Sequence, residues 1–206
     1  MLRVLILPIF CINLFFLNFK VFAEISINDL LFNEEKAFHL RLLEALPDEA
    51  KIEYGSSDSK NIIIEFMDYH CGYCKKIHPE LIEIANERDD LKIVFIQLPI
   101  LSESSFLISK LVIGANFQNK GFDLHHHLFS ETGSLTQKKL EHAIKKSDID
   151  EIKLQIDMGR PEIEKIIKIS SFLAKGIGIR GTPALLVNEE FIGGYVSKKE
   201  IIKLLN

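Results

Sequence analysis

Two kinds of apolar pattern alternate along this chain and divide it into expected strands and helices. Four short apolar runs have the length and the β-branched content of strands, at 61–67, 91–98, 184–187 and 190–192. Elsewhere apolar residues recur at three- and four-residue spacing, as on one face of a helix. The expected helices cover 27–46, 75–88, 103–117, 122–129, 136–146, 149–158, 161–175 and 197–205, with Asp148 and Pro161 at two of the helix starts. The segment 53–60, which contains Gly, Ser and Asp, is predicted to be a polar connector.

The order of these elements predicts the α/β fold class. A strand–helix–strand unit is followed by a helical block, 102–175, and then by a strand–strand–helix unit. We therefore expect one α/β domain formed by 61–101 and 176–206, with the helical block inserted between its halves. An N-terminal helix and connector, 24–60, precede this domain.

The first 23 residues have the composition of a secretory signal peptide. Arg3 precedes an apolar run over 4–19, and a small-x-small type of cleavage site ends at Ala23. The run is shorter than the ~20 apolar residues that span a bilayer comfortably. We therefore expect export and cleavage before Glu24, with an uncleaved membrane anchor as the alternative.

Cysteine usage and charge reduce the number of possible functional classes. The chain has three cysteines and a formal net charge of −4. Loss of 1–23 removes Cys11 and two positive charges, so only Cys71 and Cys74 remain and the protein becomes more acidic. No basic stripe is visible, which argues against nucleic acid as a partner. A domain of about 180 residues builds a core without disulfide staples, so one closely spaced pair indicates reactivity.

The sequence Cys71-Gly72-Tyr73-Cys74 lies where the first expected strand gives way to a helix. Cys71 then falls at the first helical turn, where unpaired backbone N–H groups and the helix dipole favour a thiolate. Cys74, one turn deeper, is predicted to be the resolving thiol that attacks a mixed disulfide. The pair predicts dithiol–disulfide exchange without a metal or an organic cofactor.

The alternative for the same cysteines is half of a zinc site, with Cys71, Cys74 and His78 on one helical stripe. A closed zinc site needs four ligands, and no second cluster with ligand spacing occurs after residue 23. The consecutive histidines at 125–127 point in different directions on a helix. We interpret them as helix surface with one buried imidazole.

Two acid–base groups are candidates for the chemistry. Glu65 interrupts an apolar strand, so its carboxyl is predicted to be partly buried, with a raised pKa that lets it exchange a proton with Cys74. If strand alternation points Glu65 to solvent, it has no role. His70, directly before Cys71, is a candidate to stabilise the thiolate when protonated. An exposed loop histidine without a role fits that position equally well.

Two longer motifs are Phe66-Met67-Asp68-Tyr69-His70-Cys71-Gly72-Tyr73-Cys74-Lys75-Lys76, which contains the cysteine pair, and Gly181-Thr182-Pro183. They resemble the DsbA-like branch of the thioredoxin superfamily, with the ScsC group the nearest match. The resemblance covers about 60–205 and implies a thioredoxin fold with 102–175 as an inserted helical domain. It also implies that Cys71 is the nucleophile, Cys74 the resolving thiol and Glu65 the buried strand acid.

The resemblance further implies a substrate-binding surface. A cis bond before Pro183 would hold the backbone of Thr182 beside the cysteines, ready to pair with an extended substrate segment. Gly72, Tyr73 and His70 are the other expected substrate contacts. The chain departs from the DsbA oxidase, which has Pro-His between its cysteines and Val before its cis-proline. Gly-Tyr and Thr at these positions match the isomerase DsbC and imply a less extreme oxidant.

The sequence therefore predicts an exported, periplasmic thiol–disulfide oxidoreductase that introduces disulfide bonds into unfolded or misfolded exported proteins. The segment 24–60 is too short for a separate dimerisation domain, which favours a monomer and an oxidase. An isomerase or reductase of the ScsC or DsbC type is the alternative. By resemblance, a DsbB-type membrane partner would recycle an oxidase and a DsbD-type partner an isomerase. A peptide-binding holdase or surface protein with a secondary redox role is the alternative from another class.

Overall fold

The computed structural model of this chain describes residues 35–205. The expected signal peptide, its cleavage site and the first part of the 27–46 helix lie outside the described residues. The helices are α2 (Phe38–Ala45), α3 (Gly72–Asn86), α4 (Glu103–Asn116), α5 (Gly121–Ser130), α6 (Gln137–Lys146), α7 (Glu151–Met158), α8 (Pro161–Gly176) and α9 (Lys198–Leu204), with a short 3-10 turn at Asp48–Ala50. The strands are β1 (Lys51–Gly55), β2 (Asn61–Met67), β3 (Leu91–Gln97), β4 (Ala184–Val187) and β5 (Glu190–Gly193).

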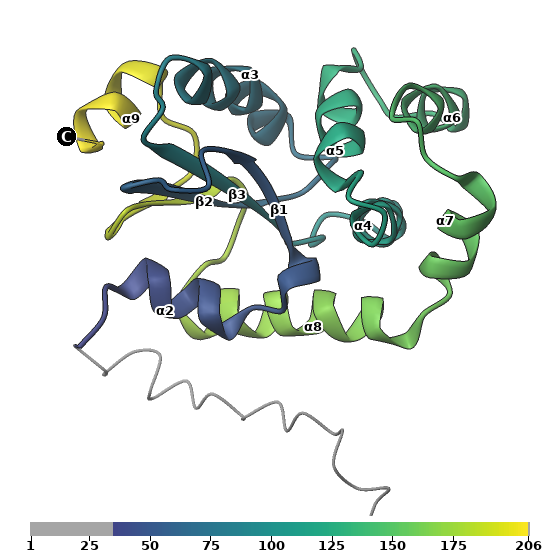
Figure 1. Ribbon diagram of the computed structural model, residues 1–206, viewed down its shortest axis with the longest axis horizontal. Helices are drawn as coiled ribbons and strands as arrows, with labels where there is room; N and C mark the ends of the chain where they lie inside the picture. The colour runs from purple at the N-terminus through teal and green to yellow at the C-terminus, as the bar shows by residue number, and fades with distance from the viewer. Residues whose placement is uncertain (1–34, 206) are drawn as a thin grey trace, which may run out of the picture.

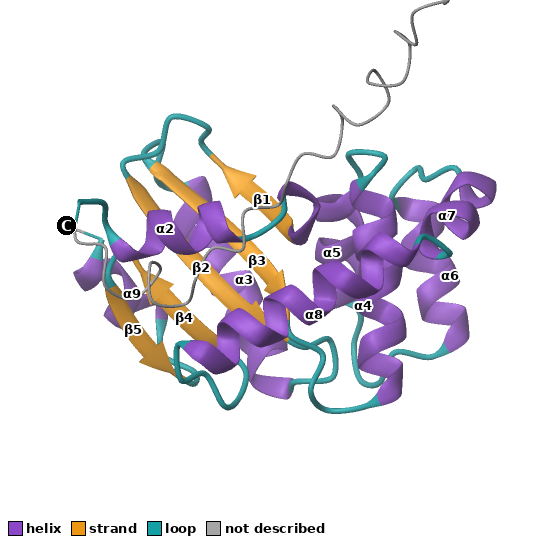
Figure 2. Ribbon diagram, turned by 90° about the horizontal axis from the view of Figure 1, so that it is seen from below, coloured by secondary structure: helices purple, strands orange, loops and turns teal. Residues whose placement is uncertain are grey.

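One mixed sheet with the strand order β1-β3-β2-β4-β5 forms the centre of the molecule. β2 and β3 are parallel, and the other neighbouring pairs are antiparallel. Helices α3 and α9 cover one face of the sheet, and α2 and α8 cross the other face (Figures 1 and 2). The helices α4 to α7 lie together at one side of the sheet (Figure 1). This arrangement confirms the expected α/β class with an inserted helical block.

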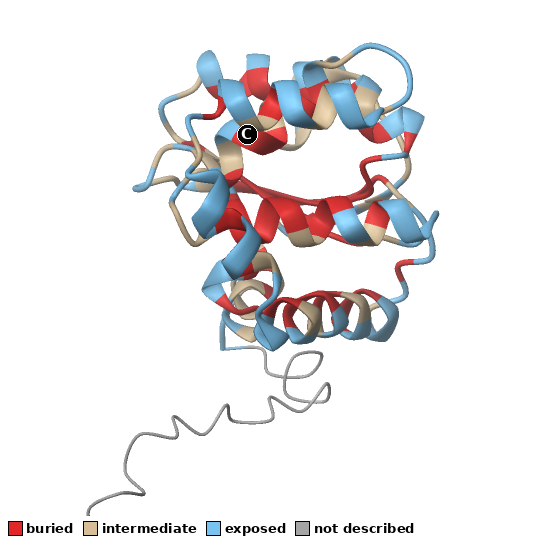
Figure 3. Cartoon of the chain, turned by 90° about the vertical axis from the view of Figure 1, so that its right-hand side faces the viewer, coloured by how far each residue is buried: buried red, intermediate tan, exposed pale blue. Residues whose placement is uncertain are grey.

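Alternation along the central strands produces two apolar cores, one on each face of the sheet. Ile63 and Met67 of β2 pack with α3, α5 and α9, whereas Ile64 and Phe66 pack with α2 and α8. In Figure 3 the strands at the centre are buried, whereas the helices around them carry both buried and exposed residues. The end of β2 that leads into the cysteine motif therefore lies between two filled layers.

The sequence prediction is wrong at the first strand. Residues 53–55, expected at the start of the polar connector, belong instead to the edge strand β1 (Lys51–Gly55), which is antiparallel to β3. Ile52 is fully buried against the sheet, while Gly55 adopts a positive φ of 100° that ends the strand. The pairing partner lies some forty residues further along the chain, so the strand is stabilised by a contact that local composition does not show.

Two predicted helices also differ from the structure. Within the described residues the N-terminal helix covers only Phe38–Ala45. Asp150, and not Asp148, caps α7, because its side chain accepts a hydrogen bond from the backbone N–H of Lys153. Asp148 has a positive φ of 51° in the preceding turn. Pro161 is at the start of α8 as expected.

Helix α2 uses its apolar side within its own chain. Leu42 and Leu46 are buried in the core between the sheet and α8. Phe38 at the start of the helix donates its backbone N–H to Glu189 in the β4–β5 turn, at 3.3 Å. The described part of the N-terminal segment is therefore a cover for the sheet.

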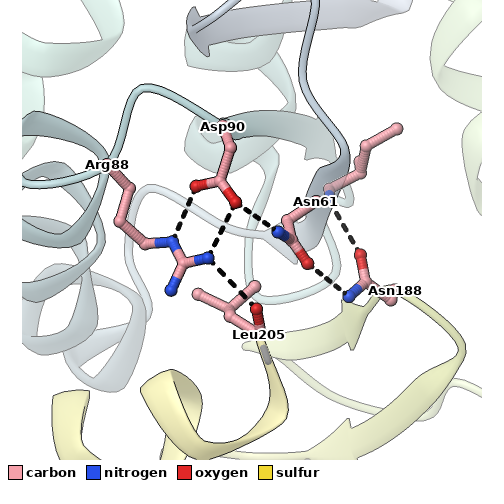
Figure 4. A network of polar contacts seen from close by, with 6 residues as sticks. Asn61, Arg88, Asp90, Asn188 and Leu205 are labelled. Atoms are coloured by element: carbon pink, nitrogen blue, oxygen red, sulfur yellow. Dashed lines mark hydrogen bonds and ion pairs between the residues drawn. The ribbon is translucent and has the colours of Figure 1, made fainter.

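A network of polar contacts holds the opposite end of the sheet from the cysteines (Figure 4). Asn61, at the start of β2, donates to Asp90 at 2.8 Å and accepts from the Asn188 amide at 2.9 Å. Asp90 also pairs with Arg88, whose guanidinium donates to the carbonyl of Leu205 at 3.2 Å. These contacts tie the starts of two parallel strands to the β4–β5 turn and to the C-terminal helix, so the sheet is anchored away from the site.

None of the helices within residues 35–205 combines the length and the apolar composition that a membrane crossing requires.

Candidate active site

The two cysteines lie at the junction of β2 and α3. α3 begins at Gly72, so Cys71 is its N-cap residue, and the Cys71 sulfur accepts a hydrogen bond from the backbone N–H of Cys74 at 3.4 Å. Both are free thiols. Cys71 retains 8% of its surface in contact with solvent, whereas Cys74 is fully buried. Cys71 is therefore the thiol that an incoming substrate can reach.

The environment of Cys71 favours its thiolate. The pKa of this thiol is lowered from 9.0 to about 5, chiefly by the side chain of Cys74, with burial acting in the opposite direction. The Thr182 side chain and the backbone N–H groups of Cys74 and Tyr73 lower the pKa further. The N–H groups are the unpaired donors of the first helical turn, which is the effect expected from the sequence.

Thr182 lies directly beside the nucleophile. The Thr182–Pro183 peptide bond is cis, as the resemblance implied. The Cys71 thiol donates to the carbonyl oxygen of Thr182 at 3.1 Å. The buried Thr182 hydroxyl has no hydrogen-bond partner within residues 35–205, and it lies where it lowers the pKa of Cys71. The carbonyl thus holds the thiol, and the hydroxyl is placed to donate to the thiolate.

Glu65 lies beneath Cys74, buried to 1% exposure on the face of β2 that α3 covers. Burial raises its pKa well above the usual value, while contact with the Cys74 side chain lowers it. Burial likewise raises the pKa of Cys74, with further contributions from Cys71 and Glu65. Glu65 is thus buried, as the sequence predicts, and its contact with Cys74 places a carboxyl that can give or take a proton next to the resolving thiol.

Asp68 organises the loop that carries the cysteines, a role that sequence reasoning missed. Its buried carboxylate accepts hydrogen bonds from the backbone N–H groups of His70, Ile100 and Leu101 and from the Ser105 hydroxyl, at 2.7–3.0 Å. Its carbonyl accepts from the N–H of Cys71 at 3.0 Å. Only the fold brings the loop after β3 to this carboxylate, so an Asp near a turn was the sole local signal.

The other predicted substrate contacts lie on the surface around Cys71. Gly72 is exposed, with open space where a side chain would be. Tyr73 is 62% exposed and stacks on Tyr195, with ring centroids 6.1 Å apart. The exposed ring of His70 lies 3.1 Å from the Ser104 hydroxyl. His70 is not among the groups that lower the pKa of Cys71.

His78 belongs to an aromatic cluster and not to the cysteine pair. It is buried against Phe95 and Phe129, and its Nε2 lies 3.1 Å from Nδ1 of His126. His125 is fully buried, which agrees with the single buried imidazole expected in the histidine run. Among residues 35–205 no three His, Cys, Asp or Glu side chains are grouped to hold a metal ion.

A thiolate titration checks the electrostatics of Cys71. We expect the ultraviolet absorbance of the thiolate in reduced protein to titrate with a midpoint of about 5. Cys74→Ala removes the largest stabilising contact and should move the midpoint to higher pH. Because the folded pKa lies below the unfolded one, this thiolate stabilises the reduced fold above pH 9, and the contribution is lost as the pH falls through about 5. A midpoint near 9 in the native protein would contradict this account.

Comparison with known proteins agrees with this geometry. A family model described as thioredoxin matches residues 48–206. Comparison with curated protein sequences gave no match. Among solved structures, the catalytic domain of Proteus mirabilis ScsC is 27% identical, with a TM-score of 0.71 over 79% of this chain and 92% of that chain. The thiol-disulfide exchange protein alpha-DsbA2 from Wolbachia pipientis is 26% identical, with a TM-score of 0.73 over 81% of this chain and 91% of that chain.

A third similar structure is a periplasmic thioredoxin-like protein from Salmonella enterica serovar Typhimurium. It is 25% identical, with a TM-score of 0.68 over 80% of this chain and 93% of that chain. The likeness is not confined to the sheet and its flanking helices but reaches into the helical block, since each comparison covers about four fifths of this chain.

Proposed function

Because this chain belongs to the thioredoxin family and is a DsbA-like thiol–disulfide oxidoreductase, we propose that it introduces disulfide bonds into exported proteins through Cys71 and Cys74. The observation that carries the proposal is the position of Cys71 at the start of α3, where its sulfur accepts the backbone N–H of Cys74 at 3.4 Å and lies 3.1 Å from the Thr182 carbonyl oxygen. This environment lowers the pKa of Cys71 to about 5. A thiolate that is stable in the reduced protein makes the Cys71–Cys74 disulfide a ready electron acceptor.

The reaction proceeds by two exchanges. A substrate thiolate attacks the sulfur of Cys71 in the Cys71–Cys74 disulfide, and Cys74 leaves as a thiolate that takes a proton from Glu65. A second substrate thiolate then attacks the substrate sulfur of the mixed disulfide, closes the substrate disulfide and expels Cys71 as a stabilised thiolate. Two electrons pass from the substrate dithiol to the cysteine pair.

The surface around Cys71 supports an unfolded protein as the substrate. Tyr73, Ile100 and Leu101 are each about half exposed or more. The backbone N–H groups of Ile100 and Leu101 donate to Asp68, which lies in the loop that carries Cys71. Exposed apolar side chains beside a nucleophile favour an extended apolar segment, and the backbone of Thr182 offers it hydrogen bonds. This assigns substrate alignment to Thr182 and Pro183 and substrate contact to Gly72, Tyr73 and His70.

The N-terminal segment supports an oxidase working as a monomer. Among the N-terminal residues that the structure describes, α2 packs its apolar side against the sheet of its own chain, so this helix offers no free apolar face for assembly. We place the protein in the periplasm, with a DsbB-type membrane partner returning the pair to the disulfide. The isomerase alternative rests on Gly72, Tyr73 and Thr182, and it would use a DsbD-type partner.

Two assays with ribonuclease separate these functions. The oxidised protein is mixed with reduced, unfolded ribonuclease. We expect one disulfide to form in ribonuclease for each Cys71–Cys74 disulfide that is reduced. With scrambled ribonuclease and limiting thiol, an oxidase reactivates little. Robust reactivation, together with an oligomer in solution, would replace the oxidase by an isomerase. A biological role that survives Cys71→Ser would favour a holdase or surface protein instead.

A further inference from the structure

A row of buried polar side chains leads from Glu65 away from the cysteines, between the sheet and helices α3 and α5. Gln97, the last residue of β3, shares the face of Glu65, because Glu65 pairs with Phe95 and side chains alternate along the strand. The Tyr69 hydroxyl contacts the Gln97 side chain and lies 2.9 Å from Nδ1 of His125. The row therefore joins the proton site under Cys74 to the helical insertion.

The row contains polar atoms without a regular partner. Glu65 Oε1, both amide atoms of Gln97 and Nε2 of His125 are buried and form no hydrogen bond of normal geometry within residues 35–205. Burying such atoms unpaired is costly, so each calls for an explanation. Glu65 and Gln97 stand on neighbouring strands, on the same face of the sheet, and carry complementary unpaired atoms.

The direction of a hydrogen-bond chain here depends on the proton of Glu65. With Glu65 protonated, a complete chain would have its O–H donate to the Gln97 oxygen, the Gln97 amide donate to Tyr69, and the Tyr69 hydroxyl donate to Nδ1 of His125. When Glu65 is ionised it only accepts, so the Gln97 amide must turn and every bond reverses. A neutral imidazole serves both arrangements by exchanging its tautomer.

We propose that His125 and Tyr69 orient the side chain of Gln97, and that the Gln97 oxygen then faces Glu65 and holds the proton that Glu65 exchanges with Cys74. All three are positioning residues. The proposal rests on the disulfide exchange proposed above and extends it to three side chains that do not touch the reacting sulfurs. Through His125 it gives the inserted helical block a part in the redox site.

The titratable groups around Glu65 come from three elements. β3 and β4 present Phe95, Gln97 and Leu185 beside it, none of which titrates. The titratable neighbours are Cys71 and Cys74 at the start of α3, Asp68 and Tyr69 in the loop after β2, and, beyond Tyr69, His125 of α5 with His78 of α3 and the half-buried His126. A change confined to Tyr69 or Gln97 therefore leaves every charged partner of Glu65 in place.

Oxidised glutathione separates the two exchange steps. Reduced protein should react in a first phase that depends on glutathione concentration, when Cys71 forms the mixed disulfide, and a second that does not, when Cys74 displaces glutathione. We expect Tyr69→Phe to keep the first phase and to slow the second about fivefold, the effect of one hydrogen bond. The pH midpoint of the second phase should fall, because the acid form of Glu65 loses its oriented acceptor.

Three variants complete the test. Gln97→Met should reproduce the slower second phase, and the double variant should be no slower than either single one. Tyr54→Phe is the control, because its hydroxyl bonds to Asn86 and its ring stacks on Phe122 in the same layer without reaching Glu65. A second phase in Tyr69→Phe and Gln97→Met equal to that of the wild type, or additive slowing in the double variant, overturns the inference. Absence of both phases in the wild type instead overturns the proposed function.

Discussion

Replacing Cys71 by serine is expected to abolish disulfide exchange, with the rate falling at least about a thousandfold to the uncatalysed level. Cys71 is the thiol with remaining solvent contact and with a pKa lowered to about 5, whereas Cys74 is fully buried with a raised pKa. A serine hydroxyl at this position stays protonated at neutral pH and forms no disulfide. The measurement is the oxidation of reduced ribonuclease by the variant and by the wild type under the same conditions.

Cys74→Ser is the matched control for this result. It keeps the nucleophile but removes the resolving thiol, so the reduced variant should accumulate a covalent mixed disulfide through Cys71. Mass spectrometry after mixing with oxidised glutathione detects this adduct, and Cys71→Ser should show none. If Cys71→Ser formed the adduct and Cys74→Ser did not, the roles of the two cysteines would be reversed.

Asp68→Ala is expected to have the largest effect on stability, a loss of about 3 kcal/mol in the free energy of unfolding. The change leaves the backbone N–H groups of His70, Ile100 and Leu101 and the Ser105 hydroxyl without their acceptor. Water can reach part of this loop, since Ile100 and Leu101 are about half exposed, which keeps the loss below the sum of four buried bonds. Urea unfolding of the oxidised protein measures it.

Two further variants show whether the carboxylate is responsible. Asp89→Ala removes an exposed carboxylate from the other end of the sheet and should change the free energy of unfolding by less than about 0.5 kcal/mol. Asp68→Asn keeps the shape and one acceptor oxygen and should fall between the two. Exchange activity should decline with stability in Asp68→Ala, because the same loop carries Cys71. Equal stability of Asp68→Ala and Asp89→Ala would contradict the role given to Asp68.

Local patterns in the sequence were sufficient for the central elements and for the reacting pair. β2, β3 and α3 follow from short apolar runs and helical spacing, and the chemistry of Cys71 follows from its place at a helix start. Glu65 could be predicted because an acid within a buried strand stands out against its neighbours. Each of these properties depends on residues within a few positions of one another. Such residues are close in space however the rest of the chain packs, so the sequence alone is enough to predict them.

The tertiary structure alone decided the features that join distant segments. β1 was hidden because its pairing with β3, and not its composition, makes it a strand. Asp68 gathers the loop after β3 from more than thirty positions away. Thr182 meets the Cys71 sulfur across 111 positions of the sequence, a proximity that the family resemblance implied but that no local pattern encodes. Tyr69 finds His125 across 56 positions. Sequence spacing carries the geometry of a helix or a strand, but a hydrogen bond between two elements depends on how they pack, so its partners become visible only in the folded chain.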